Sequence, residues 1–170
     1  LVPGLTAWSV NRLTVSNCAL ILANSGLQLT VTNDLRIDQG GALGIGVLSD
    51  AANASVSCGG SCLLTNGGVL AVYSGPTNGA ARDYGALVSI AGDLQLAPGS
   101  WIYPFAHETD GGAPLVRAQR LFLATNSGVS ANGRGFTIGA GPGAGVAGTW
   151  RAGGGHGGKG GHAAWGETGG

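Results

Sequence analysis

The stretch LTVTNDLRIDQGGALGI, residues 29–45, contains the pattern that decides the fold of this chain. Apolar and polar residues alternate in short runs that meet turns rich in Gly, Asn and Asp, as expected of β-strands that bury one face. Similar stretches begin at Leu13, Ala54, Leu87 and Leu115. We interpret each unit as a pair of strands. Because no helical pattern separates the units, they predict an all-β solenoid of about five irregular coils, each burying its apolar side chains against the next.

The turns allow the units to be aligned with one another. Residues 33–35, Asn-Asp-Leu, align with residues 92–94, Gly-Asp-Leu, and the turn at 38–41 aligns with the turn at 97–100. These turn residues tolerate positive φ or bond to their own backbone. The starts of successive units are 16 to 33 residues apart. The coils are therefore expected to differ by loops inserted at the turns.

The same pattern divides the chain into three parts. We expect residues 1–12 to be a lead-in or N-terminal cap and residues 13–138 to form the coils. Residues 139–170 are rich in glycine, and we expect them to pack on the solenoid or to continue into further sequence. Two polar loops, 74–86 and 106–114, interrupt the coils, and a solenoid usually places its binding surface on such loops.

Composition excludes several classes of function. The 170 residues are 44% hydrophobic, enough to fill a core, but only 9% are charged, and the eight basic and eight acidic side chains balance. No basic cluster of the kind that binds nucleic acid or anchors a chain to a membrane surface is present. No apolar run reaches the length of a membrane span. The chain contains no Met, which we interpret as a sign of a processed protein or a section of a longer one.

Three cysteines suggest where the protein is located. Cys58 and Cys62 enclose two glycines and a serine, so they could close a small disulfide loop in an oxidising compartment or remain thiols. A zinc site is not expected, because the three histidines lie far away in the sequence. Cys18 lies among apolar residues, and we expect it to be an inert buried thiol.

An aromatic row is the first candidate site. Trp101, Tyr103, Phe105 and His107 alternate with other residues, so in a strand they would share one face. Such a row could stack on sugar rings, or it could fill the core of one coil, since large aromatic side chains are usually buried.

Acidic side chains are the second candidate. Glycosidases need two carboxyl groups roughly 5 to 10 Å apart. The acidic residues available in this part of the chain are Asp83, Asp93, Glu108 and Asp110. We include Glu108 and Asp110 among the candidate sugar contacts. Most of the acidic residues are expected to be solvated side chains in turns. Calcium at Glu108 and Asp110 would have too few ligands. We therefore predict no catalytic residues and no metal site.

A cofactor is not expected either. Residues 153–159 match GxxxxGK, the first part of a phosphate-binding loop. The Ser or Thr that would hold magnesium is absent, and no helix former follows. A glycine tract of this density produces such matches by chance.

The C-terminal half resembles a known group of proteins. The sequence PLVRAQRLFLATNSGVSANGRGF from Pro114, followed by GAGPGAG and then RAGGGHGGKGG, resembles very large secreted or cell-surface proteins of bacteria that are predicted to form right-handed parallel β-helices. The resemblance implies that hand for the solenoid and an extracellular location, in an adhesin, surface layer or fibre. No catalytic residues can be carried over from it, because no shared motif fixes any.

These observations predict a non-catalytic structural or adhesive section of a secreted or cell-surface protein. Its partners would be further copies or neighbouring solenoid sections, which would meet it at the open ends of the coils. The alternative is a carbohydrate-active enzyme, either a polysaccharide lyase or a glycosidase, or a polysaccharide-binding module on the same scaffold.

Overall fold

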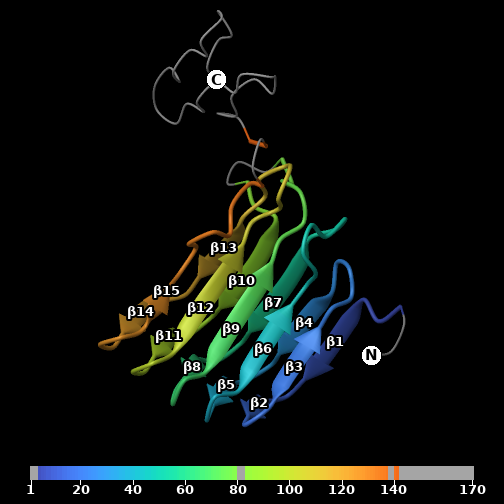
Figure 1. Ribbon diagram of the computed structural model, residues 1–170. Helices are drawn as coiled ribbons and strands as arrows, with labels where there is room; N and C mark the ends of the chain where they lie inside the picture. Colours follow the sequence, from blue (N-terminus) through green and yellow to red (C-terminus); the bar gives the residue numbers. More distant parts are fainter. Residues whose placement is uncertain (1–3, 80–82, 138–139, 142–170) are drawn as a thin grey trace, which may run out of the picture.

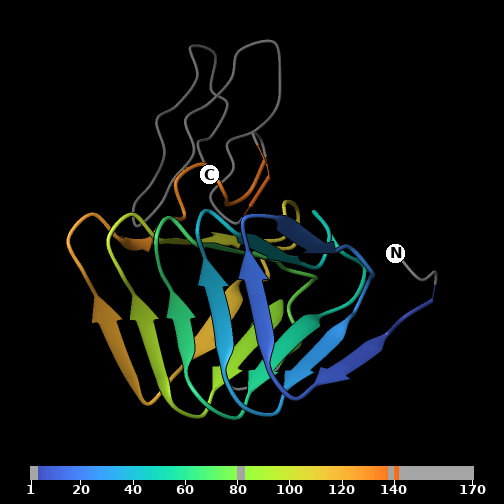
Figure 2. The same ribbon diagram turned by 90° about the horizontal axis from the view of Figure 1, so that it is seen from below.

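The computed structural model describes residues 4–79, 83–137 and 140–141. They form a parallel β-solenoid of five coils, in which each coil contributes one strand to each of three five-stranded sheets. Figures 1 and 2 show the coils stacked along one axis, from β1–β3 at one end to β13–β15 at the other. Among the described residues there is no helix, and so none that could cross a membrane. The predicted all-β solenoid of about five coils is confirmed.

The three sheets are named A, B and C in the order in which the chain visits them. Sheet A contains β1 (Ala7–Val10), β4 (Gln28–Val31), β7 (Ala54–Cys58), β10 (Ala86–Ile90) and β13 (Pro114–Arg117). Sheet B contains β2 (Leu13–Ser16), β5 (Leu35–Asp38), β8 (Cys62–Leu64), β11 (Asp93–Leu96) and β14 (Arg120–Leu123). Sheet C contains β3 (Ala19–Leu22), β6 (Ala42–Ile45), β9 (Val69–Tyr73), β12 (Trp101–Phe105) and β15 (Gly128–Val129).

Aliphatic ladders form the core. Parallel pairing in register places equivalent residues of successive coils above one another, about 4.8 Å apart, and alternation sends every second side chain inward. One ladder of sheet B consists of Val15, Ile37, Leu64, Leu96 and Leu123. The matching ladder of sheet C consists of Leu20, Leu43, Leu70, Ile102 and Val129. Each coil thus buries its apolar side chains mainly on its neighbours, which explains why the period of two recurs in every unit.

The corner between sheets B and C contains a residue with positive φ, which is a glycine in the three middle coils. Gly40, Gly67 and Gly99 have φ of 69°, 78° and 78° and lie at the same level of successive coils. Their stacking confirms the predicted alignment of the turns at 38–41 and 97–100. Leu35 and Leu94 both align with Cys62, which confirms the other predicted alignment.

Each coil has three strands, so the interpretation of a unit as a pair of strands is wrong. The corner between sheets A and B is the reason, because it is only two or three residues long, and in the first, second and fifth coils it contains neither Gly nor Pro. Two strands therefore look like one interrupted run. Strand β1, Ala7–Val10, lies inside the segment 1–12 expected to be a lead-in or cap, and it pairs with β4.

Most of the predicted glycine-rich segment lies outside the described residues. Of residues 139–170, only 140 and 141 are described. The predictions about the packing of this segment and about the GxxxxGK match at 153–159 therefore concern residues that the structure does not describe.

Candidate functional site

The aromatic row lies on the outer face of sheet C. Trp101, Tyr103 and Phe105 alternate with Ile102, which is fully buried, so the three rings point away from the core and are partly exposed. The alternative that they fill the core of a coil is therefore wrong. Outside the solenoid, the rings of Trp101 and Tyr103 are nearly parallel, with centroids 6.5 Å apart.

Several faces of these rings are occupied by other side chains of the chain. Tyr73, one coil earlier, stacks on Phe105 with ring centroids 4.4 Å apart. The guanidinium of Arg134 lies 4.3 Å from the ring centroid of Tyr103 and 4.8 Å from that of Phe105. Its Nη1 donates to the carbonyl of Asn132 over 2.9 Å. The row is thus bound into a cation–π and stacking cluster, which stabilises the outer face and leaves less ring surface for a sugar.

The polar loop that follows the row is held by hydrogen bonds. Asp110 Oδ1 accepts from the Thr77 backbone N–H over 2.6 Å, and that bond lowers the pKa of Asp110. The two predicted loops therefore touch. Ser49 Oγ donates to Glu108 Oε2 over 3.1 Å, and the Asp110 N–H donates to His107 Nδ1 over 3.1 Å. The side chains of His107, Glu108 and Asp110 therefore bind loops of other coils or their own turn, and such contacts hold the loop in place.

Acidic residues at the corners also have structural partners. Asp38 accepts from Arg36 over 2.7 Å, from Asn66 over 2.9 Å and from the Gln39 backbone N–H over 2.7 Å, and these bonds, led by the one from Arg36, lower its pKa. Asp83 accepts from two backbone N–H groups of its own loop. No group of three or more His, Cys, Asp or Glu side chains suited to a metal ion occurs in the described part of the chain.

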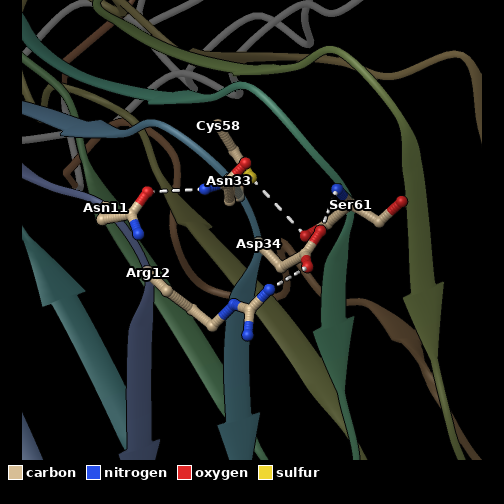
Figure 3. Close-up of polar contacts among 6 residues, drawn as sticks. All are labelled: Asn11, Arg12, Asn33, Asp34, Cys58 and Ser61. Carbon is tan, nitrogen blue, oxygen red and sulfur yellow. Dashed lines mark hydrogen bonds and ion pairs between the residues drawn. The ribbon is translucent and has the colours of Figure 1, made fainter.

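All three cysteines are free thiols in the structure. Cys58 and Cys62 face the core, and burial raises the pKa of both. Cys58 Sγ donates to the Asn33 carbonyl over 3.1 Å, as Figure 3 shows. The disulfide between Cys58 and Cys62 stays a prediction. Cys18 is exposed, so the expectation of a buried thiol there is wrong. It lies at a corner of the first coil, which among the described residues has a neighbouring coil on one side only.

A polar ladder at the corner between sheets A and B escaped the sequence analysis. It consists of Arg12, Asp34, Ser61, Asp93 and Arg120, one from each coil. Arg12 pairs with Asp34 over 3.5 Å, and Asp34 accepts from the Ser61 N–H over 3.0 Å (Figure 3). The Asp93 N–H donates to Ser61 Oγ over 3.2 Å, and Arg120 binds both carboxylate oxygens of Asp93 over 2.9 Å. The ladder links all five coils.

The outer face of sheet B, beside this ladder, is hollowed. Two adjoining hollows of about 400 and about 340 Å³ share Leu63 and Gln95. The first extends toward Arg12 and Arg36, and the second extends toward Phe122.

The last coil exposes its inward side. Leu123 is 51% exposed, although Leu96 directly beneath it in the same ladder is 2% exposed. Leu121 and Val129 are exposed to a similar extent, and an apolar hollow of about 340 Å³ lies between them and the coil below. The first coil differs, because Val15 is 2% exposed and Trp8 packs against the core there. Within the described residues, the core is therefore open at the C-terminal coil.

This geometry combines a scaffold, a hollowed outer face and an open end. The predicted loops 74–86 and 106–114 lie together, but their acidic side chains form hydrogen bonds that hold the loops in place. Comparison of the chain with protein-family models, curated proteins and solved structures finds no match.

Proposed function

We propose that the chain is a non-catalytic structural or adhesive section of a secreted or cell-surface protein, such as a fibre, surface layer or adhesin. The open end of the core carries this proposal. Leu121, Leu123 and Val129 occupy positions that are buried in the four preceding coils or packed against their core, yet each is about half exposed. A coil with this inner surface is suited to being covered by another coil.

Backbone geometry supports the same role. Strands β13, β14 and β15 each pair on one side only among the described residues, so their other edges present N–H and C=O groups along all three sheets. Unpaired edges are sites for the addition of further strands. Parallel strands of a neighbouring solenoid section or a second molecule would satisfy these groups and cover the apolar side chains in one step.

The extracellular part of the proposal rests on the resemblance to large bacterial surface proteins with glycine-rich segments. Low charge fits it, because 9% charged residues leave little electrostatic repulsion between solenoids that pack end to end or side by side. The non-catalytic part is supported by the contacts of Asp83, Asp93, Glu108 and Asp110, each of which accepts hydrogen bonds from its own loop or from another coil.

Small-angle scattering and sedimentation of the full chain over a range of concentrations test the proposal. We expect extended particles that lengthen as concentration rises, and filaments by electron microscopy. Leu123→Glu should prevent the lengthening by placing a charge on the open end. Leu48→Glu is the matched control, because Leu48 is 53% exposed but lies in the loop after β6. A compact monomer at high concentration, or equal effects of the two variants, would contradict the proposal.

A further inference from the structure

The hollowed outer face of sheet B forms one continuous groove along the solenoid axis. The two hollows meet at Leu63 and Gln95. The outward positions of the sheet are in register, so the floor of the groove has one side chain per coil. From the first coil to the last these are Thr14, Arg36, Leu63, Gln95 and Phe122. With neighbouring strands about 4.8 Å apart, the floor is about 19 Å long.

The floor combines apolar surface with side chains that can form hydrogen bonds. Leu63 and Phe122 offer apolar surface. Phe122 is 48% exposed, and the Arg120 guanidinium lies 5.6 Å from the centroid of its ring. Between and beside them lie Thr14 and Gln95, whose side chains form no hydrogen bond with any described residue. An amide both donates and accepts, so Gln95 can bind a pair of neighbouring hydroxyl groups.

Charge along the groove is balanced. Arg12 pairs with Asp34, Arg36 with Asp38, and Arg120 with Asp93. Each guanidinium therefore has its counter-ion already, and an anionic chain would find no unpaired cation. The same pairs still present spare N–H donors and carboxylate lone pairs at the solvent-exposed rim, since Arg12 is 65% and Arg36 48% exposed.

We propose that this groove binds an uncharged linear polysaccharide that lies along the solenoid axis. A pyranose ring has an apolar face that suits Leu63 and Phe122, and equatorial hydroxyl groups that suit Gln95 and the rims of the ion pairs. The repeat of one coil is close to the length of one sugar in an extended chain, so successive sugars would meet successive rungs. A peptide strand fits less well, because the backbone groups of this face are already paired within sheet B.

This binding goes beyond the structural role and does not depend on association of the ends. It also differs from sugar binding by Trp101, Tyr103 and Phe105, since that row lies on sheet C and is partly covered by Arg134. Glycan affinity and end-to-end assembly can therefore fail separately.

Isothermal titration calorimetry with cello-oligosaccharides of increasing length, at concentrations where the chain is monomeric, tests the proposal. Affinity should rise with each added sugar up to roughly four, the number that fits the floor, and then level off. It should change little between low and high salt, because the charges are balanced. Gln95→Ala should weaken binding roughly three- to tenfold, as loss of one hydrogen-bonding side chain predicts. Leu63→Asp should abolish binding.

Matched controls lie on the outer face of sheet A. Gln28→Ala and Leu87→Asp change the same residue types at outward positions of β4 and β10, and both should keep the affinity of the parent protein. Circular dichroism would confirm that each variant folds. Absence of binding to the neutral oligosaccharides, binding only of acidic polysaccharides such as polygalacturonate, or equal losses on the two sheets would overturn the proposal.

Discussion

Truncating the same ladder position in different coils should have very different effects on stability. Leu64 is 0% exposed in the middle coil, so Leu64→Ala should lower the free energy of unfolding by about 3–5 kcal/mol, from lost transfer free energy plus a cavity. Leu123 occupies the equivalent position of the last coil with 51% exposure. About half of its side chain remains in water, and its removal opens no enclosed cavity. Leu123→Ala should therefore cost about 1 kcal/mol.

Urea unfolding of dilute full chain, followed by circular dichroism, measures both losses, with an unchanged slope as the check that the transition is comparable. Equal losses of unfolding free energy for Leu123→Ala and Leu64→Ala in dilute solution would mean that the last coil is already covered in the monomer, which would contradict an open end. Repeating the measurement at rising concentration adds a second test. Assembly through this end would bury Leu123 and increase its cost, whereas the cost at Leu64 would stay the same.

Four other predictions concern corners, cysteines and titrating groups. Gly68→Ala should cost about 1–3 kcal/mol in urea unfolding, because the added Cβ would lie 2.4 Å from a carbonyl oxygen of the neighbouring coil. Gly135→Ala, which meets open space, should have an effect within about 0.5 kcal/mol, and equal effects would contradict tight corner packing. Iodoacetamide should label exposed Cys18 in the folded protein and Cys62 only after unfolding; Cys62 that resists labelling even when unfolded without reductant would indicate a disulfide. Because burial raises the pKa of Cys62, stability should be complete below the unfolded value near 9.0 and should decline at higher pH. The pKa of Asp38 is lowered, so its contribution should be present above the ordinary value of 3.8 and lost in more acidic solution, and Asp38→Asn should reduce this acid dependence of the urea midpoint.

The number of coils could be predicted because each coil repeats the same local chemistry. Inward positions must be apolar to stack, and the corners before Gly41 and Gly68 need residues that accept positive φ, such as Gly40 and Asn66. The apolar inward positions and the positive-φ corner residues remain recognisable although the loops differ in length. The third strand could not be recognised, since the corner between sheets A and B is only two or three residues long and in the first, second and fifth coils has no glycine or proline to mark a turn.

The face of β12 that points into the core could not be predicted from that strand alone, but it follows from alignment of the units. Alternation shows that Trp101 and Ile102 face opposite ways, but residue size alone favours the larger ring for the core. Alignment of the units resolves the choice. Ile102 aligns with Leu70 and Leu43, which are similar in size, whereas Trp101 aligns with Val69 and the small Ala42. A stacked core needs rungs of similar size, so the aliphatic ladder is the inner one.

The polar ladder restricts which coil can continue the stack at the open end. It is symmetric in charge, with Arg12 and Arg120 at its ends and a carboxylate next to each. A second copy stacked in register on the last coil would place its Arg12 against Arg120. Two exposed like charges at that distance oppose association, by an amount that salt reduces. The ladder therefore weakens direct stacking of identical copies without preventing it, so the lengthening with concentration should be greater at high salt. A coil with Asp or Ser at this corner, as in the three middle coils, would stack on the open end more tightly.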